Sequence, residues 1–409
     1  MRIAEAVHRV IGQNTPVRVV AYDGSRAGAD DAPVSLDVRS PTAWSHLATA
    51  PSALGLARAY VTGSIDVVGD LYTALRSLPE LSIRDIPGDL RPWLVGRLAA
   101  AAVWWPVRPP AQEVRLGGRR HSRRRDASAI SHHYDVSNQF YEWVLGPSMA
   151  YTCAVYASET TTLEQAQYAK FDLVARKLDL RPGMRLLDVG CGWGGMVMHA
   201  ARHYGVRALG VTLSRNQAEW AQKRIAEEGL DGVAEVRHLD YRAVRETEFD
   251  AVSSIGLTEH IGQANLAAYF RLLYDKLRPG GRLLNHCITR PDNSIAARTR
   301  GFINRYVFPD GELVSPGRVV SLMHDTGFEV RHEENLREHY ARTLAAWGDN
   351  LERHWPEAVR EAGLGTARVW RLYMAGSRLG FDRNVVQLHQ VLGVRLDHGR
   401  SGMPLRPDW

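Results

Sequence analysis

A glycine-rich segment, DVGCGWGG at residues 188–195, restricts the fold of this chain more than any other feature. It joins RLLDV (185–189), an apolar run typical of a buried strand, to MVMHAARHY (196–204), which has the spacing of a helix ending at Gly205. Glycines at such a turn let the backbone approach a ligand, and the first N–H groups of the following helix have no partner within that helix. The segment therefore predicts a strand–turn–helix unit that binds a small molecule.

Strands and helices alternate after this unit. Further strands are expected at ALGV (208–211), AEVRHL (234–239), FDAVSSIG (249–256) and GRLLNHCI (281–288). One helix is expected to begin at Ser214, because Ser214 and Gln217 have the spacing of a capping box, and to end at Gly229. This alternation predicts an α/β domain in which a parallel sheet carries helices on both faces.

The glycine-rich turn is compatible with more than one ligand. Gly190, Gly192 and Gly195 satisfy the G-x-G-x-x-G pattern of dinucleotide sites. Such a site needs an acidic residue at the end of the second strand to hold the ribose, and that end reads GVTLS. Asp188, just before the first glycine, completes D-x-G-x-G-x-G, which suits S-adenosylmethionine. We favour the methyl donor; a nicotinamide site and a purely structural turn are the alternatives.

Composition narrows the remaining possibilities. The chain has 409 residues, 45% of them hydrophobic, which suffices for a large core and for two or three domains. Its formal net charge of +6 favours anionic partners such as nucleic acid or an acidic lipid surface. The three cysteines are scattered, so we expect neither disulfides nor a metal site, and a reducing cytoplasm fits. No apolar run approaches the ~18 residues that span a bilayer.

Eight sequence blocks, in this order along the chain, carry a family resemblance. They are HYDVSNQFYEWVLGPSMAYTCAVY, LDVGCGWGG, GVTLSRNQ, EHIG, LNHCI, FINRYVFPDGELVSP, HYARTLAAW and QLHQV. From about His132 to Gln390 the chain resembles the cyclopropane-fatty-acyl-phospholipid synthase family, which includes the mycolic acid cyclopropane synthases. The resemblance implies a class I S-adenosylmethionine-dependent methyltransferase (Rossmann-like) α/β domain. It also implies a cytoplasmic enzyme that works on phospholipid acyl chains at the inner face of the membrane.

The resemblance implies the cofactor-binding residues by position. Tyr151 and Thr152 occupy the family's Tyr-Ser pair, and the threonine keeps the hydroxyl. The full set implied to bind S-adenosylmethionine is Tyr151, Thr152, Asp188, Gly190, Gly192, Gly194, Thr212, Leu213, Gln217, Asp240 and Tyr241. Gln217 could instead serve only its capping box, and Asp240 could simply cap a loop.

The family also holds a bicarbonate ion beside the reacting carbons. The corresponding residues, which the resemblance implies are catalytic, are Cys153, Glu259, His286, Ile288 (through its backbone) and Tyr340. Taken singly, Cys153 could be a small core residue and His286 an ordinary strand histidine. Because Glu259 beside an anion would form a pair of like charges, we predict that a proton is shared between them.

The expected chemistry is attack of an alkene on the sulfonium methyl, which leaves a carbocation on the acyl chain. Aromatic faces can stabilise such a cation, and the candidates are Tyr141, Trp143, Phe302, Tyr306 and Phe308. Thr258 stands where the family commonly has phenylalanine, a form resembling the actinobacterial branch that makes 10-methylene and, with a separate reductase, 10-methyl (tuberculostearic-type) chains. A cyclopropane product, a methyltransferase for a non-lipid acceptor and a non-catalytic lipid-binding protein are the alternatives.

Three parts are expected along the chain: a smaller α+β domain at 1–108 for lipid docking or dimerisation, a basic linker at 109–130, and the catalytic domain at 131–409. LAAAAVWW (98–105), followed by the basic run 115–125, suits an anionic headgroup interface. A core helix followed by a solvated loop is the alternative. No nucleic-acid-binding motif accompanies the basic run, so we expect no nucleic-acid partner. We expect a homo-oligomer.

Overall fold

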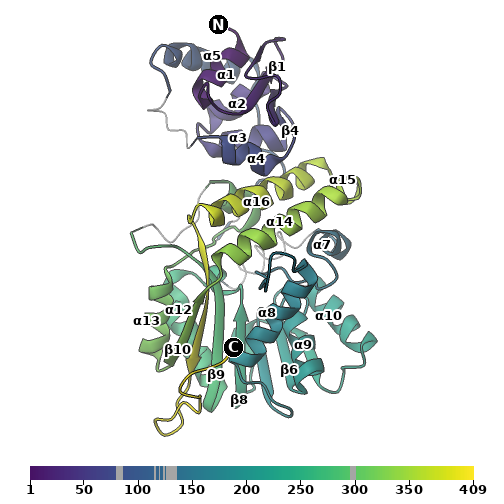
Figure 1. Ribbon diagram of the computed structural model, residues 1–409, viewed down its shortest axis with the longest axis vertical. Helices are drawn as coiled ribbons and strands as arrows, with labels where there is room; N and C mark the ends of the chain where they lie inside the picture. Colours follow the sequence, from purple (N-terminus) through teal and green to yellow (C-terminus); the bar gives the residue numbers. More distant parts are fainter. Residues whose placement is uncertain (80–85, 115–116, 119, 123–124, 126–135, 295–300) are drawn as a thin grey trace. The chain divides into compact units, whose positions relative to one another are not determined.

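The computed structural model describes residues 1–79, 86–114, 117–118, 120–122, 125, 136–294 and 301–409 (Figure 1). The chain divides into two compact units, and each is built from three segments. The first comprises Met1–Arg115, Arg300–Val307 and Trp355–Leu379; the second comprises Leu116–Thr299, Phe308–His354 and Gly380–Trp409. This differs from the expectation of one continuous domain at 131–409, since two later segments group with the N-terminal part of the chain.

The first unit is the smaller, α+β one. Its elements are α1 (Ile3–Ile11), β1 (Val17–Ala21), β2 (Arg26–Ala27), β3 (Val34–Val38), α2 (Thr42–Thr49), α3 (Ala53–Val61), β4 (Ile65–Val68), α4 (Leu71–Ser77), α5 (Leu90–Trp104), the π-helix η4 (Ile303–Val307), α15 (Trp355–Ala362) and most of α16 (Leu364–Asp382). The strands form one sheet in the order β2-β1-β3-β4. Val17 and Val19 of β1 pack with Ile3 of α1 in its core.

The expected linker is partly built into this unit. Glu113 and Val114 lie within the predicted linker, yet both are buried. Glu113 accepts two hydrogen bonds from the guanidinium of Arg58, at 2.7 and 2.8 Å. Much of the basic run 115–125, and all of 126–130, lie outside the described residues.

The second unit contains the glycine-rich turn. Its elements are α7 (Asn138–Leu145), α8 (Leu163–Lys177), β5 (Arg185–Val189), α9 (Gly195–Tyr204), β6 (Arg207–Thr212), α10 (Arg215–Glu227), β7 (Ala234–His238), η2 (Tyr241–Ala243), β8 (Phe249–Ile255), α11 (Thr258–Ile261), η3 (Gln263–Asn265), α12 (Leu266–Lys276), β9 (Leu277–Thr289), α13 (Pro316–Thr326), β10 (Glu329–Asn335), α14 (Arg337–Arg353) and β11 (Gln387–Val394). Every strand expected from the sequence between 185 and 288 is present.

The seven strands form a mixed sheet in the order β10-β11-β9-β8-β5-β6-β7. The pairs from β9 to β7 are parallel, as predicted. β11 is the difference, because it runs antiparallel to both of its neighbours, β9 and β10. The α/β architecture expected from the sequence is therefore present, with a mixed sheet in place of a fully parallel one.

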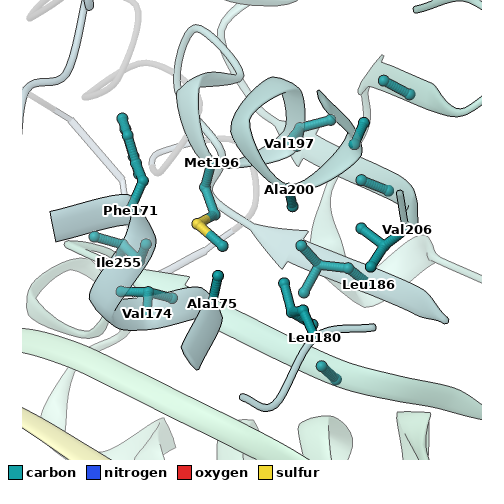
Figure 2. Packing of buried hydrophobic residues seen from close by; sticks show 14 of the residues in the cluster. Phe171, Val174, Ala175, Leu180, Leu186, Met196, Val197, Ala200, Val206 and Ile255 are labelled. Carbon is teal, nitrogen blue, oxygen red and sulfur yellow. The ribbon is translucent and has the colours of Figure 1, made fainter. Parts of the chain in front are cut away.

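Helices cover both faces of this sheet. α8, α9 and α10 pack on one face and α12 and α13 on the other (Figure 1). Figure 2 shows the first face, where Phe171 of α8, Met196 and Val197 of α9 and Leu186 of β5 belong to one cluster of buried side chains. This packing places the start of α9 against the ring of Phe171: a Cβ added at Gly195 would lie 2.7 Å from it. The core thereby fixes the turn that precedes α9.

Candidate active site

The glycine-rich turn has the backbone shape that the sequence predicted. Gly190, Gly192 and Gly194 adopt φ angles of 72°, 56° and 80°, a region that residues with a Cβ rarely occupy. Gly194 then caps the N-terminus of α9. A Cβ added at Gly192 would have, among the described atoms outside its neighbours in the chain, only the Nε2 of Gln217 within 4.0 Å. The turn therefore leaves room for a ligand to approach the backbone.

Two residues at the end of β6 are linked to each other. The Thr212 hydroxyl donates to Oε1 of Gln217 at 2.9 Å. Ser214 caps α10 by accepting from the backbone N–H of Gln217, as expected. The Gln217 side chain does not complete the capping box, because its Oε1 is engaged by Thr212 and its Nε2 faces Gly192. Its amide is thus oriented toward the turn.

The third group of expected cofactor residues lies after β6 and β7. The carbonyl of Leu213 contacts Nε2 of His238 at 3.1 Å. Asp240 caps η2, and both of its carboxylate oxygens accept from Arg242. The ring of Tyr241 packs edge-on against Tyr269, with centroids 5.3 Å apart.

A buried lysine, which the sequence analysis did not select, joins several of the expected residues. Nζ of Lys170, on α8, donates to the Thr152 hydroxyl at 2.8 Å. Its charge also acts on Cys153, Asp188 and His286, so these side chains lie within electrostatic range of one ammonium group. Asp188 in turn accepts a hydrogen bond of 2.6 Å from the hydroxyl of Ser253, its register partner on β8. The turn and the strand candidates therefore share one electrostatic centre.

Burial sets the charge state of this centre. It lowers the pKa of Lys170 to about 7, against the opposing charges of Cys153 and Asp188. It raises the pKa of Asp188 to about 7, against the Ser253 hydrogen bond and the charge of Lys170. Burial also raises the pKa of the Cys153 thiol far above its usual range. Cys153 is therefore a thiol, not a thiolate nucleophile.

Glu259 binds the part of β9 that extends beyond the end of β8. The last paired residue of β8, Ile255, lies opposite His286, and the chain then turns into α11. Oε1 of Glu259 accepts from the backbone N–H of Ile288 at 2.6 Å. Ile288 lies two residues beyond His286, about 7 Å along the strand. Burial raises the pKa of Glu259 to about 7, against these backbone hydrogen bonds.

Two buried polar atoms here lack a hydrogen-bond partner among the described residues: Oε2 of Glu259 and Nε2 of His286. An unsatisfied buried polar atom costs about 1–3 kcal/mol, so natural structures rarely keep one without a function. Burial, followed by the charges of Lys170 and Lys177, holds the pKa of His286 well below its usual range. The ring is therefore neutral.

Cys153 and Tyr340 meet at the start of α14. The Cys153 thiol donates to the carbonyls of Ala154 and Leu336, at 3.2 and 3.8 Å. The same Leu336 carbonyl accepts from the backbone N–H of Tyr340 at 3.1 Å. The Tyr340 ring is buried and lies 4.6 Å from the ring of Phe381.

Aromatic rings connect these groups. We use the term aromatic belt for Tyr141, Tyr151, Trp193, Phe308, Tyr340 and Trp347. Successive centroids lie 4.7 Å apart for Trp193–Tyr141, 6.0 Å for Tyr141–Tyr151, 5.4 Å for Tyr151–Trp347, 6.0 Å for Trp347–Tyr340 and 6.5 Å for Tyr151–Phe308. Phe308 also contacts His260, the neighbour of Glu259, at 5.4 Å. The belt thus leads from the glycine-rich turn to Tyr340 and to His260, the residue next to Glu259.

Not every aromatic candidate belongs to it. Tyr141 and Phe308 are members, whereas Trp143 stacks on His354. Phe302 and Tyr306 lie in the first unit and stack on each other.

Sequence reasoning missed Lys170, Trp193 and Trp347. A signal for Lys170 existed: the buried face of α8 is mostly apolar, yet Gln167, Lys170 and Lys177 lie on it. A charged residue on an apolar helical face is seldom buried without a partner.

The residues present fit the two groups that the resemblance implies. For S-adenosylmethionine, the open space beside Gly192 and the amide of Gln217 offer room and a polar contact. For a small oxyanion, the neutral His286 and a Glu259 that is partly protonated near pH 7 offer donors without partners among the described residues.

Comparison with known proteins agrees with the fit of these residues to S-adenosylmethionine. Residues 121–391 match the family described as mycolic acid cyclopropane synthetase. Over 405 residues the chain is 55% identical to a probable fatty acid methyltransferase of Mycobacterium tuberculosis, covering 96% of this chain and 95% of that one. It is 35% identical to the cyclopropane-fatty-acyl-phospholipid synthase of Escherichia coli, over 64% of this chain and 66% of that one.

A solved structure is also similar. Mycolic acid cyclopropane synthase CmaA1, in complex with SAH and CTAB, aligns with a TM-score of 0.61 and 31% identity. The alignment covers 66% of this chain and 98% of that one.

Proposed function

Because the chain belongs to the mycolic acid cyclopropane synthetase family, we propose that it methylates the double bond of an unsaturated, oleoyl-type acyl chain in a phospholipid. The coarser activity is that of its relatives: it is an enzyme that modifies lipids with S-adenosylmethionine as the methyl donor. The proposal adds the acceptor, the phospholipid setting, a bound bicarbonate and a 10-methylene product.

One observation carries the proposal: the buried Glu259 and His286 side chains each present an atom with no partner among the described residues. A methyltransferase for a nucleophilic amine or hydroxyl has no need for a buried oxyanion site of this kind. Methylation of an alkene does, because the resulting cation must lose a proton from carbon, and a base must lie close to it.

The chain's own residues supply the rest of the chemistry. S-adenosylmethionine, when bound, supplies an electrophilic methyl group. The glycine-rich turn and Gln217 would orient it, and proximity to the alkene would then provide much of the rate. The aromatic belt would face the acyl cation, stabilising it through ring quadrupoles and excluding the water that would capture it.

The proton would leave through the Glu259 region. Bicarbonate, when bound, supplies an acceptor where no side chain reaches. His286 would donate to it from Nε2, and Glu259, with a pKa of about 7, would share a proton with it. Cys153 and Tyr340, at the start of α14, would complete the enclosure.

The product proposed is the 10-methylene chain, which a separate reductase would convert to the 10-methyl form. Thr258 supports this choice, since it replaces the aromatic residue common in the family. Its buried hydroxyl donates to Asn285 at 2.6 Å, immediately before Glu259. A smaller, polar side chain there changes the wall beside the cation. The alternatives are direct closure to a cyclopropane ring and an acceptor other than lipid.

We propose that α5 brings the enzyme to the lipid surface. Val103 and Trp104 are 74% and 73% exposed, and Val95 is 64% exposed, an unusual apolar surface for a helix. Among the described helices, none is both long and apolar enough to cross a bilayer. Of the basic run, the described Arg120 and Arg125 pair with Asp310.

The test is expression in a bacterial host that lacks its own synthase and is fed oleate, followed by gas chromatography–mass spectrometry of phospholipid fatty acids. We expect a product one methylene heavier than oleate. Catalytic hydrogenation under mild conditions separates an exomethylene branch from a ring. If the chain folds and binds S-adenosylmethionine but yields no heavier product, the proposal that a phospholipid acyl chain is the methyl acceptor is wrong.

A further inference from the structure

A row of polar side chains crosses three strands of the large sheet. Glu334 of β10 is the register partner of Gln390 on β11, and Gln390 is the register partner of His286 on β9. Partners in register point to the same face of a sheet. Lys177, the last residue of α8, reaches this row from above that face and is fully buried.

The direction of each hydrogen bond in the row follows from donor chemistry. The Lys177 ammonium only donates, and it bonds Oε1 of Gln390 at 2.7 Å and the carboxylate of Glu334. Nε2 of Gln390 therefore faces Nδ1 of His286, 3.2 Å away. Since an amide nitrogen only donates, Nδ1 must accept and carries no proton.

The remaining nitrogen then carries the ring proton. His286 is neutral, because burial and the positive charges of Lys170 and Lys177 disfavour the imidazolium. A neutral ring has a single N–H, and here it is on Nε2. That atom is buried and has no hydrogen-bond partner within the described part of the chain.

We propose that Lys177 and Gln390 are positioning residues that lock His286 in the Nε2–H tautomer and so aim one buried donor at the oxyanion beside Glu259. The identity of the acceptor rests on the proposed function; the tautomer does not. Where a histidine must present one particular nitrogen, a hydrogen bond at its other ring nitrogen commonly fixes the tautomer.

The tautomer is measured in the full-length protein by nitrogen NMR with ¹⁵N-labelled histidine. The resonances lost in His286→Gln identify the ring. We expect the native ring to be protonated on Nε2 alone. In Gln390→Glu, the carboxylate can only accept, so Nδ1 should become protonated. A native ring protonated on Nδ1 would overturn the proposal, whatever lipid product is found.

Turnover provides the second readout. Gln390→Glu and Lys177→Met should lower kcat by about 10- to 100-fold, the usual effect of removing a histidine's orienting partner. The affinity for S-adenosylmethionine should not change, which also shows that each variant is folded. Lys177→Arg, which keeps a donor, should recover most of the loss.

Gln387→Glu is the matched control, because Gln387 is on the same strand and its side chain donates to Asn384 instead of to His286. It should leave both kcat and the His286 spectrum unchanged. Variants with a shifted tautomer but native kcat would contradict a role for the lock in turnover. If the wild-type protein yields no lipid product while His286 is protonated on Nε2, the proposed function is wrong and the proposed tautomer is supported.

Discussion

Glu259 shows how burial alone can give a carboxyl group a neutral-pH proton equilibrium. Its usual pKa of 4.5 is raised to about 7, first by burial, while the Ile288 N–H opposes the shift. A raised pKa in the folded state means that the fold binds the proton more tightly than the unfolded chain. The corresponding stability is fully present below pH 4.5 and is lost as the pH rises through 7.

Glu259→Gln should therefore stabilise the protein at alkaline pH. The amide keeps an acceptor for Ile288 and carries no charge. The shift from 4.5 to about 7 corresponds to about 3 kcal/mol, so the variant should gain up to that amount at pH 8 and little at pH 4.5. Urea unfolding across this pH range measures it, and turnover should be lost while cofactor binding persists.

Glu338→Gln is the control, because the Glu338 side chain is 84% exposed and its ion pair with Arg337 lies at the surface. A Glu259→Gln stability difference that does not grow between pH 4.5 and pH 8 would contradict the buried, proton-sharing carboxyl.

The sequence could predict the residues that act through local pattern. The turn at Gly190–Gly194 and the cap at Ser214 need only neighbouring residues, and both are confirmed. Gln390 lies within the block QLHQV, but its role depends on strand register and on Lys177, which is 213 residues away in sequence. No local pattern encodes that pairing. The roles of Glu259, His286 and the other site residues stay predictions.

At the scale of elements, the sequence did not predict that β11 runs antiparallel to its neighbours. QLHQVLGV in β11 is buried along almost its whole length. Its polar residues Gln387, His389 and Gln390 alternate irregularly with apolar ones, and such a pattern is compatible with either strand direction. For α5, the apolar run was compatible with both a core helix and a surface helix. Val103 and Trp104 are exposed, which favours the surface interpretation.

Val103→Asp and Trp104→Asp should weaken co-sedimentation of the protein with phosphatidylglycerol vesicles. Each apolar side chain that enters a lipid interface contributes about 1.5–3 kcal/mol, so we expect a loss of about tenfold or more for each variant. Val385→Asp, which changes a 49% exposed valine of the second unit, is the control. Equal loss in the control, or none in α5, would remove the helix from the docking surface.

At the scale of the whole molecule, the first unit is assembled from distant parts of the sequence. Arg58 and Glu113 form a buried ion pair, and the hydroxyl of Tyr306 lies 3.4 Å from the same carboxylate. Arg368 of α16 donates to the Tyr60 carbonyl at 2.8 Å and to Asp66 at 3.0 Å. Removal of residues 1–115 would therefore leave the buried guanidinium of Arg368 without its Tyr60 and Asp66 partners.

Arg58→Met should destabilise the protein by about 3–5 kcal/mol, because it leaves the Glu113 carboxylate buried without its main partner. Arg58→Met combined with Glu113→Gln should recover part of that loss. Both are measured by denaturant unfolding at pH 7. If the single variant unfolds like wild type, the buried pair does not contribute to the stability of the first unit.

The position of β11 also sets an order of events during synthesis. Among the described strands this one comes last in sequence, yet it inserts between β9 and β10, which are made earlier. Until residues 387–394 leave the ribosome, both of those strands expose an unpaired edge, and such edges recruit foreign strands. The nascent enzyme therefore stays an open sheet, without the Gln390–His286 contact, until β11 has been made. It then completes its sheet and its proposed anion site in a single closing step.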